Sequence, residues 1–317
     1  GIATPATTVN KMCGSGMKTV MMAYDALHAR PGDVIVAGGM ESMTNAPYLL
    51  LKGRGGMRIG HDRVYDHMML DGLEDAYEPG RAMGTFGEEC AAHYQFSRAD
   101  QDAFATASVQ RAKAATESGA FATEITPVTV KGRSGEVTVS IDEGPGKVKL
   151  DKIPTLKPAF KKDGTITAAS SSSINDGAAA MVLMRASTAH TLGLKPLARI
   201  VSHATHAQEP NWFATAPVGA VHKALEKAHW RAQDVDLWEV NEAFAVVPMA
   251  LMRELSLSHD IVNVNGGACA LGHPIGASGA RIMVTLIHAL QARGLRKGLA
   301  TLCIGGGEAT ALALELI

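Results

Sequence analysis

The feature that most constrains the fold of this chain is an internal repeat that relates its two ends. Three pairs of neighbouring residues recur at one constant offset, namely Ser15-Gly16 with Ser278-Gly279, Ala26-Leu27 with Ala289-Leu290, and Ala29-Arg30 with Ala292-Arg293. After a short insertion the match continues, with Gly38, Gly39 and Glu41 aligned to Gly305, Gly306 and Glu308. Self-similarity over such a distance indicates two halves built on one plan.

The first copy of the repeat predicts an α/β structure. Residues 17–30 form a run with few helix breakers, so a helix is expected there. The β-branched run at residues 33–37 ends in glycines and predicts a buried parallel strand. A helix followed by a strand is typical of helices layered on a sheet, which places the chain in the α/β class.

The second copy is preceded by more structure than the first. A strand at 197–201, a helix at 217–229, a strand at 236–240 and a helix from residue 243 are expected before Ser278. In the first half, 14 residues stand before Ser15. By this internal comparison we expect roughly 60 to 75 further residues, with at least two strands and two helices, to precede Gly1. The first half is therefore expected to be incomplete.

The region between the two copies suggests how the chain divides. Residues 51–89 are rich in Gly, Met, Asp and Arg, so we expect a loop excursion of the kind that is usually functional or interface-forming. Residues 1–50 and 90–165 are assigned to the first half, and residues 166–317 to the second. The regular elements expected between the copies are a helix at 97–119 that opens with a capping box, strands at 124–130 and 136–141, and a buried strand at 178–184.

The composition shows no strong electrostatic preference. Hydrophobic residues make up 46% of the chain, charged residues 19%, and the net charge is −1, so neither nucleic acid nor an anionic membrane surface is indicated as a partner. No apolar run reaches the ~18 residues that a membrane-spanning helix needs. We expect a cytoplasmic protein of a bacterium, with the mitochondrial matrix as the second choice.

The four cysteines do not form a recognisable framework. They are widely spaced and contain no C-x-x-C pair, which favours neither disulfides nor a zinc site. His61 and His67 lie near Asp62 and Asp66, but a loose group in a glycine-rich segment is more often a solvated loop than a metal site. We therefore expect no metal.

Cys13 stands at the start of the helix predicted for residues 17–30, within the stretch VNKMCGSGMK. The free N–H groups and the dipole at a helix N-terminus favour an anion, so they favour the thiolate, which is the nucleophilic form. The alternative is that Cys13 is a small buried apolar residue, as most free cysteines are. The stretch alone leaves both interpretations open.

Asn241 and His273 mark two turns of the second half. Asn241 lies where a strand passes into a helix, so it either caps that helix or faces a ligand at the end of the sheet. His273 stands between a glycine and a proline in a loop that leads into a helix, in the region that the repeat equates with Cys13. A pseudo-twofold axis between the halves would bring Cys13 and His273 face to face, as a Cys/His nucleophile pair requires.

Cys303 ends a strand just before Gly305, Gly306 and Gly307. This arrangement is either a tight turn after a buried strand or a second reactive cysteine beside backbone N–H groups that form an oxyanion hole. Two cysteines and a histidine on glycine-rich turns at strand ends favour the functional interpretation when they are taken together.

At these residues the chain resembles the thiolase family. The matching stretches are VNKMCGSG at residues 9–16, NEAF at 241–244, GHP at 272–274 and CIGGG at 303–307. The likeness covers nearly the whole chain and is nearest to the acetyl-CoA acetyltransferase branch. It implies a duplicated, layered α/β/α/β/α fold, coenzyme A as substrate with no cofactor, and a homotetramer, a dimer of dimers, in which residues 51–89 serve assembly and substrate covering.

The resemblance also implies roles for single residues. Cys13 would carry the acyl group as a thioester, and His273 would assist its deprotonation and bind the thioester oxygen. Cys303 would move the α-proton of the second substrate. Asn241 would hold a water of one oxyanion hole, while the N–H groups of Cys13 and Gly305 form the other. The residues that would bind the substrate and its pantetheine arm are Ser172, Phe160, Met83, Ala243 and Phe244.

The activity implied is the reversible Claisen condensation of two acetyl-CoA molecules, with a longer-chain 3-ketoacyl-CoA thiolase and a catalytically silent acyl-CoA-binding relative as alternatives. Relatives of the acetoacetyl type often carry His where this chain has Ala82, so the acyl chain length is left open. A nucleotide-dependent oxidoreductase is excluded, because no G-x-G-x-x-G follows a strand with an acidic residue ~20 positions further on.

Overall fold

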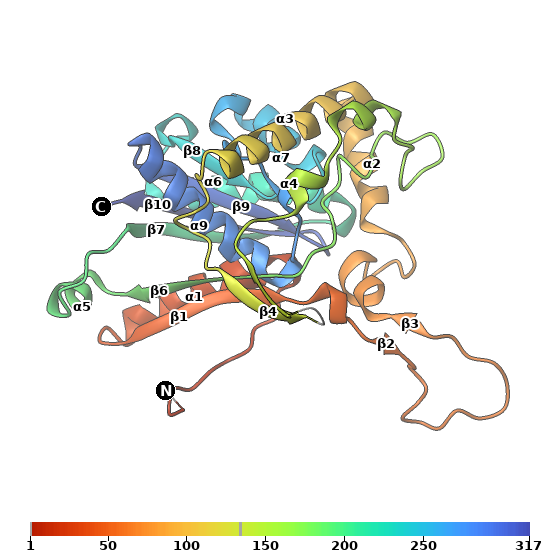
Figure 1. The fold of residues 1–317 in the computed structure, drawn as a ribbon, viewed down its shortest axis with the longest axis horizontal. Coiled ribbons are helices and arrows are strands. Elements are labelled where there is room, and N and C mark those ends of the chain that lie inside the picture. The colour runs from red at the N-terminus through yellow and green to blue at the C-terminus, as the bar shows by residue number, and fades with distance from the viewer. Residues whose placement is uncertain (1, 133–134) are drawn as a thin grey trace.

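The computed structural model describes residues 2–132 and 135–317 (Figure 1). Its strands are β1 (Val34–Glu41), β2 (Tyr48–Leu49), β3 (Tyr65–Asp66), β4 (Val128–Gly132), β5 (Gly135–Val139), β6 (Gly177–Met184), β7 (Ala198–Ala207), β8 (Leu237–Val240), β9 (Lys297–Ile304) and β10 (Glu308–Leu316). Its helices are α1 (Ser15–Ala29), α2 (Met83–Tyr94), α3 (Arg98–Glu117), α4 (Gly144–Lys147), α5 (Ala186–Thr191), α6 (Ala216–Ala228), α7 (Val246–Leu255), α8 (Ala268–Leu271) and α9 (Ile275–Arg293). Short helical turns are η1 (Met12–Gly14), η2 (Met43–Asn45), η3 (Met69–Leu73), η4 (Leu150–Thr155), η5 (Pro210–Thr215), η6 (Ala232–Asp234) and η7 (His259–Ile261).

The second half is built on a four-stranded sheet in the order β7-β10-β9-β8. β10 runs antiparallel to both of its neighbours, whereas β8 and β9 are parallel. Helices α6 and α7 pack on one face of this sheet and α9 packs on the other (Figure 1). The strands predicted at 197–201 and 236–240 and the helix predicted at 217–229 are confirmed, and the helix predicted from residue 243 begins at Val246.

The first half contains a two-stranded sheet of β1 and β6, paired antiparallel from Val34 opposite Met184 to Glu41 opposite Gly177. The prediction of a buried parallel strand at 33–37 is therefore wrong. A β-branched run shows that a strand forms, but its partner lies far along the chain and cannot be identified from the run. The strand predicted at 178–184 forms, but it pairs with the first half, which favours a boundary between the halves after β6 rather than at residue 166.

The two halves meet where α1 and α9 cross between the sheets. A Cβ placed on Gly16 would lie 2.7 Å from the backbone nitrogen of Ala280, and a Cβ on Gly279 would lie 2.4 Å from that of Met17. Only glycine permits this close approach of two backbones. Gly16 and Gly279 are equivalent in the sequence repeat, so the two helices that cross here are equivalent and each contributes the same glycine to the contact.

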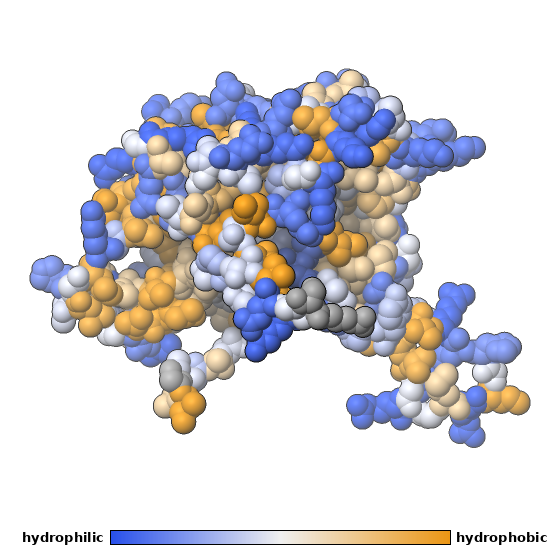
Figure 2. Space-filling view, in the orientation of Figure 1, coloured by the Kyte–Doolittle hydropathy of each residue, from blue (hydrophilic) through white to orange (hydrophobic). Residues whose placement is uncertain are grey.

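The outer face of the β1–β6 sheet is open. Val36 is 70% exposed and Val182 is 62% exposed. Figure 2 shows hydrophobic side chains gathered over this part of the molecule. In the second half, by contrast, the equivalent strands β9 and β10 are flanked by β8 and β7 and covered by α6.

The segment between the halves contains more regular structure than predicted. Residues 51–82 form a projecting excursion, as expected, but the predicted loop is wrong from Met83 onward, where α2 begins (Figure 1). Gly84 and Gly87 give this stretch the composition of a loop. They serve packing instead, because a Cβ on Gly84 would lie 2.3 Å from the Phe160 ring. The helix predicted at 97–119 is confirmed as α3, with its capping box between Ser97 and Asp100.

The exposed hairpin of β4 and β5 confirms the strands predicted at 124–130 and 136–141, apart from their outer ends. Within the described residues, no helix is long and apolar enough to cross a membrane.

Candidate active site

Cys13 lies in the turn η1, immediately before α1. Ser15 Oγ accepts a hydrogen bond from the Lys11 N–H at 2.8 Å and donates one to the Met12 carbonyl at 2.7 Å. Asn10 Oδ1 accepts from the Met12 N–H at 2.9 Å. Met12 itself has a φ of 46°, a left-handed conformation that is uncommon for a residue with a side chain. These bonds hold a tight turn that fixes the position of the thiol.

The environment of Cys13 favours the neutral thiol. Burial raises its pKa to about 11, although hydrogen bonds from the backbone N–H groups of Gly305 and of Cys13 itself lower it, and the Glu41 carboxylate raises it further. The expectation that the helix N-terminus stabilises a thiolate therefore does not hold for the resting site, because loss of hydration outweighs the backbone groups. Cys13 needs a base in order to react.

Cys303 is brought to Cys13 by the end of β9. Cys303 is 1% exposed, and burial raises the pKa of its thiol well above the ordinary value, with the proximity of the Cys13 sulfur as a second cause. A Cβ on Gly14 would lie 2.3 Å from the side chain of Ile304, so η1 packs directly on the end of the strand. Cys13, Cys303 and the Gly305 N–H thus meet at one place, although they come from opposite halves.

His273 is held as a neutral base. Burial lowers the pKa of its imidazole to about 4. Its Nδ1 lies 2.5 Å from Ser278 Oγ, and that hydroxyl donates its proton to the Pro274 carbonyl at 3.0 Å. Nδ1 must then be the donor toward Ser278, which leaves a lone pair on Nε2. Nε2 is buried and has no hydrogen-bond partner, so no hydrogen bond joins it to Cys13, the partner that the sequence predicts for it.

Asn241 follows β8 and lies beside His273. Its Nδ2 is 3.5 Å from His273 Nδ1, and its Oδ1 is buried without a partner. A buried, unpaired amide oxygen is costly unless something else bonds to it. Asn241 and His273 therefore each present one unused buried polar atom, an amide oxygen and an imidazole nitrogen.

The five residues predicted to bind the substrate lie together. The rings of Phe160 and Phe244 meet edge to face with centroids 5.7 Å apart. The N–H and hydroxyl of Ser172 both donate to the Ala243 carbonyl, at 3.0 and 3.1 Å. Met83 Sδ lies 3.5 Å from the position that a Cβ on Gly305 would take, which connects this group to the cysteines.

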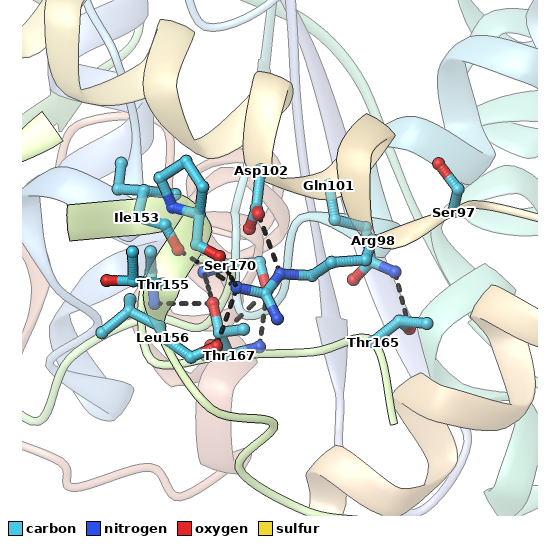
Figure 3. A network of polar contacts seen from close by, with 12 residues as sticks. Ser97, Arg98, Gln101, Asp102, Ile153, Thr155, Leu156, Thr165, Thr167 and Ser170 are labelled. Atoms are coloured by element: carbon cyan, nitrogen blue, oxygen red, sulfur yellow. Dashed lines mark hydrogen bonds and ion pairs between the residues drawn. The ribbon is translucent and has the colours of Figure 1, made fainter. Parts of the chain in front are cut away.

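A polar network on α3 holds the segment that carries Phe160 (Figure 3). The guanidinium of Arg98 donates to Asp102 at 2.8 Å and to the carbonyls of Ile153 and Leu156 at 3.1 and 2.9 Å. Gln101 Nε2 donates to Thr165 Oγ1 at 2.8 Å. The segment from 153 to 165 is thereby fixed at both ends.

A surface cavity of about 690 Å³ opens beside the turn of Gly305–Gly307. Its lining includes Asp75, Tyr77, Arg81, Gly306 and Glu308. The five predicted substrate-binding residues are not part of this lining.

Two carboxylates of the site have no predicted role from the sequence. Glu242 is fully buried and accepts hydrogen bonds from Ser108 Oγ, Asn263 Nδ2 and the Cys269 N–H, at 2.7, 2.8 and 3.0 Å. It joins the turn of Asn241 to α3 and to the loop that leads into α8. Glu41 Oε2 accepts from the Gly276 N–H at 2.9 Å, at the start of α9. The alignment of Glu41 with Glu308 in the repeat is the one sequence signal that identifies Glu41 and Glu308 as structural equivalents, and it says nothing of Glu242.

No group of three or more His, Cys, Asp or Glu side chains in residues 2–132 and 135–317 is arranged to hold a metal ion. The other two cysteines are also buried, Cys90 in α2 near Cys303 and Cys269 in α8 beside Glu242.

Comparison with known proteins agrees with this architecture. The family described as "Thiolase, N-terminal domain" matches residues 1–187, and "Thiolase, C-terminal domain" matches residues 194–316. The chain therefore belongs to the thiolase family. The family boundary falls after β6, in agreement with the pairing of β6 with β1.

Among its relatives, the acetyl-CoA acetyltransferase of Chromobacterium violaceum is 50% identical over 316 residues, which are 99% of this chain and 80% of that protein. The solved structure of the Bacillus anthracis acetyl-CoA acetyltransferase superposes with a TM-score of 0.93 at 42% identity, covering 98% of this chain and 78% of that one. The Acat5 thiolase of Ascaris suum, solved in complex with coenzyme A, gives a TM-score of 0.90 at 42% identity with the same coverage.

Proposed function

We propose that this chain is an acyl-CoA C-acyltransferase that reversibly condenses two acetyl-CoA molecules to acetoacetyl-CoA and coenzyme A. The observation that carries the proposal is the meeting of Cys13, Cys303 and the Gly305 N–H from opposite halves of the chain. The acetyl-CoA acetyltransferase names of its relatives support the same substrate class. Coenzyme A enters as part of the substrate, and no resident cofactor is required.

The first half-reaction transfers the acetyl group to Cys13. Its sulfur attacks the thioester carbonyl of acetyl-CoA while its proton passes to Nε2 of His273, the atom that has no partner in the resting site. The bond between the carbonyl carbon and the coenzyme A sulfur then breaks, and His273 returns the proton to the leaving thiolate. Because both groups are neutral at rest, no buried charge has to be maintained before the substrate binds.

The second half-reaction forms the carbon–carbon bond. Cys303 first gives its thiol proton to Nε2 of His273 and then, as the thiolate, takes the α-proton of a second acetyl-CoA. The resulting carbanion attacks the acetyl group on Cys13. The bond to Cys13 sulfur breaks, acetoacetyl-CoA leaves, and Cys13 regains a proton from His273, so that all three groups return to their neutral forms. Backbone N–H groups of Cys13 and Gly305 stabilise the oxyanion on the acetyl carbonyl, while Asn241, through a water, and His273 stabilise that of the coenzyme A thioester.

The group of Met83, Phe160, Ser172, Ala243 and Phe244 is proposed to receive the substrate and its pantetheine arm. It adjoins Gly305 through Met83, so a thioester bound there lies beside both cysteines. The apolar rings provide surface for the arm, and the Ser172–Ala243 hydrogen bonds fix the backbone that faces it.

Steady-state thiolysis tests the proposal. Purified protein given acetoacetyl-CoA and coenzyme A should form acetyl-CoA, and Cys13→Ser should remove the activity, while Glu315→Gln, at the far end of β10, should retain it. Wild-type protein that neither cleaves acetoacetyl-CoA nor condenses acetyl-CoA would support the silent acyl-CoA-binding alternative.

A longer-chain 3-ketoacyl-CoA thiolase is the second candidate, and Ala82 is the observation that favours it. A side chain without a polar group at this position removes a contact that would select a short acyl chain. Comparison of kcat/KM for acetoacetyl-CoA and a medium-chain 3-ketoacyl-CoA decides between them, and a strong preference for the longer substrate would overturn the first assignment.

We also propose a homotetramer, a dimer of dimers assembled through residues 51–82. This excursion projects from the body of the protein and exposes Met57 and Ile59, at 53% and 104% (Figure 1). Sedimentation of the purified protein tests the assembly. A bacterial cytoplasmic location is proposed on the basis of relatives such as that of Chromobacterium violaceum.

A further inference from the structure

Lys11 and Glu308 form an ion pair between the two turns that carry the reactive groups. Lys11 precedes the turn η1 by one residue, and its Nζ pairs with Glu308 Oε2. Glu308 is the first residue of β10 and directly follows the turn Gly305–Gly307. The two side chains are 25% and 28% exposed, so the pair is partly shielded from solvent.

The backbone of Lys11 is part of the rigid turn around Cys13. Its carbonyl accepts from the Gly14 N–H at 3.0 Å, and its N–H donates to Ser15 Oγ at 2.8 Å. The position of the Lys11 side chain is therefore coupled to the backbone turn that fixes Cys13.

The Gly305–Gly307 turn has no side chain with which to reach Cys13, and its close backbone packing is against Gln208 and Glu209. Gly306 and Gly307 have φ values of 86° and 85°, and none of the three glycines has a side chain. The Gly307 carbonyl accepts from the Gln208 N–H at 2.8 Å on one side. The bond from Glu308 to Lys11 lies on the other side, toward Cys13.

The internal symmetry gives this pair a counterpart. Glu41, the equivalent of Glu308, reaches from the first half to the Gly276 N–H at the start of α9. Glu308 reaches from the second half to Lys11, just before the start of α1. Glu41 and Glu308 thus occupy equivalent positions of the repeat, and each joins its own half to the start of a helix in the other half. This symmetry argues that the Lys11–Glu308 pair fixes the two halves relative to each other and is not a chance surface pair.

We propose that the Lys11–Glu308 ion pair is a positioning pair that holds the turn of Gly305–Gly307 in register with Cys13, so that the Gly305 N–H faces the Cys13 sulfur. The inference rests on the proposed function, in which that N–H stabilises the acyl oxyanion. It concerns an interaction between side chains that do not themselves touch the reacting atoms.

The test removes and then reverses the pair without changing the net charge. Lys11→Met with Glu308→Gln removes it, and Lys11→Glu with Glu308→Lys reverses it. Glu315→Gln is the matched control, because Glu315 is on the same strand and pairs with Arg199 at 2.6 Å, far along the strand from the site. Quenched-flow mass spectrometry measures the rate at which acetyl-CoA acetylates Cys13, and steady-state kinetics separates kcat from KM.

We expect the neutral double variant to acetylate Cys13 about tenfold more slowly with a nearly unchanged KM, because a small displacement of an oxyanion donor acts mainly on the transition state. The reversed pair should recover to within about threefold of wild type, and Glu315→Gln should match wild type. A neutral variant as fast as wild type, or a reversed pair as slow as the neutral one, would overturn the inference. The recovery by the reversed pair also separates a positional effect from a loss of folding.

Alkylation by iodoacetamide provides a readout that does not depend on acyl transfer. Loss of the pair should move the Gly305 N–H away from the Cys13 sulfur, which removes a hydrogen bond that favours the thiolate and so slows alkylation at constant pH. The reversed pair should restore the wild-type rate. Wild-type protein that is not acetylated would contradict the proposed function, whereas alkylation rates that are equal in all variants would contradict the positioning role.

Discussion

The crossing of α1 and α9 brings the two halves of the site together through two glycines. A larger residue at either glycine should therefore lower both stability and activity. Gly279→Ala would place a Cβ 2.4 Å from the Met17 nitrogen, about 1 Å closer than an ordinary contact. A backbone atom cannot rotate away as a side chain can, so the helices must separate. Overpacking of this size costs about 1 to 3 kcal/mol, and the gain from replacing glycine within a helix returns only about 0.5 to 1 kcal/mol.

We therefore expect Gly279→Ala to lower the free energy of unfolding by about 1 to 2 kcal/mol. Because α1 begins two residues after Cys13, a displacement of about 1 Å should also slow acetylation, by up to a hundredfold. Urea denaturation measures the first effect and single-turnover acetylation the second. Gly32→Ala is the matched control, since a Cβ there meets nothing within 4 Å.

The control should be neutral or slightly stabilising. If Gly279→Ala unfolds at the same urea concentration as Gly32→Ala and keeps full activity, the helices do not depend on the close approach at this point, and the account of the symmetric crossing is wrong.

Three further predictions concern protonation and reactivity. Ser278→Ala should lower kcat about tenfold to a hundredfold with little change in KM, because His273 Nδ1 loses the partner that fixes its tautomer. A rise in KM with an unchanged kcat would argue against a role of Ser278 in orienting His273. Iodoacetamide should label Cys13 before Cys90, which is fully buried, as peptide mapping can show; first labelling at Cys90 would contradict the site. Burial raises the pKa of Glu239 to about 8, so the folded state keeps a proton that the unfolded state releases above its ordinary pKa. The free energy of unfolding should therefore fall as the pH rises from 6 to 8. Urea titrations should show a smaller fall for Glu239→Gln, and an equal fall would contradict the buried, protonated carboxyl.

The sequence alone predicts the parts of the structure that have local signals. The repeat identifies the two helices that cross, because the Ser-Gly pairs at their starts are themselves the contact. The capping box of α3 follows from Ser97 and Asp100, whose spacing is sufficient to define it. The turns of Cys13, His273 and Cys303 could be located for the same reason, since glycine and proline mark them.

What the sequence does not predict depends on partners distant in the chain. The antiparallel pairing of β1 with β6 requires knowledge of a strand more than a hundred residues away, and no property of residues 33–37 contains it. The start of α2 is hidden in the sequence because glycine disfavours a helix, whereas Gly84 is required there for close packing against the Phe160 ring. The high pKa of the Cys13 thiol results from burial, which a stretch of sequence at a helix start cannot show.

Mass spectrometry can show directly whether Cys13 is the residue that carries the acyl group. The protein is incubated with acetyl-CoA, quenched in acid, digested and analysed by mass spectrometry. We expect one acetyl adduct, on the peptide that contains Cys13, and its loss on addition of free coenzyme A. An adduct confined to the peptides of Cys303, Cys269 or Cys90, or no adduct while thiolysis proceeds, would contradict it.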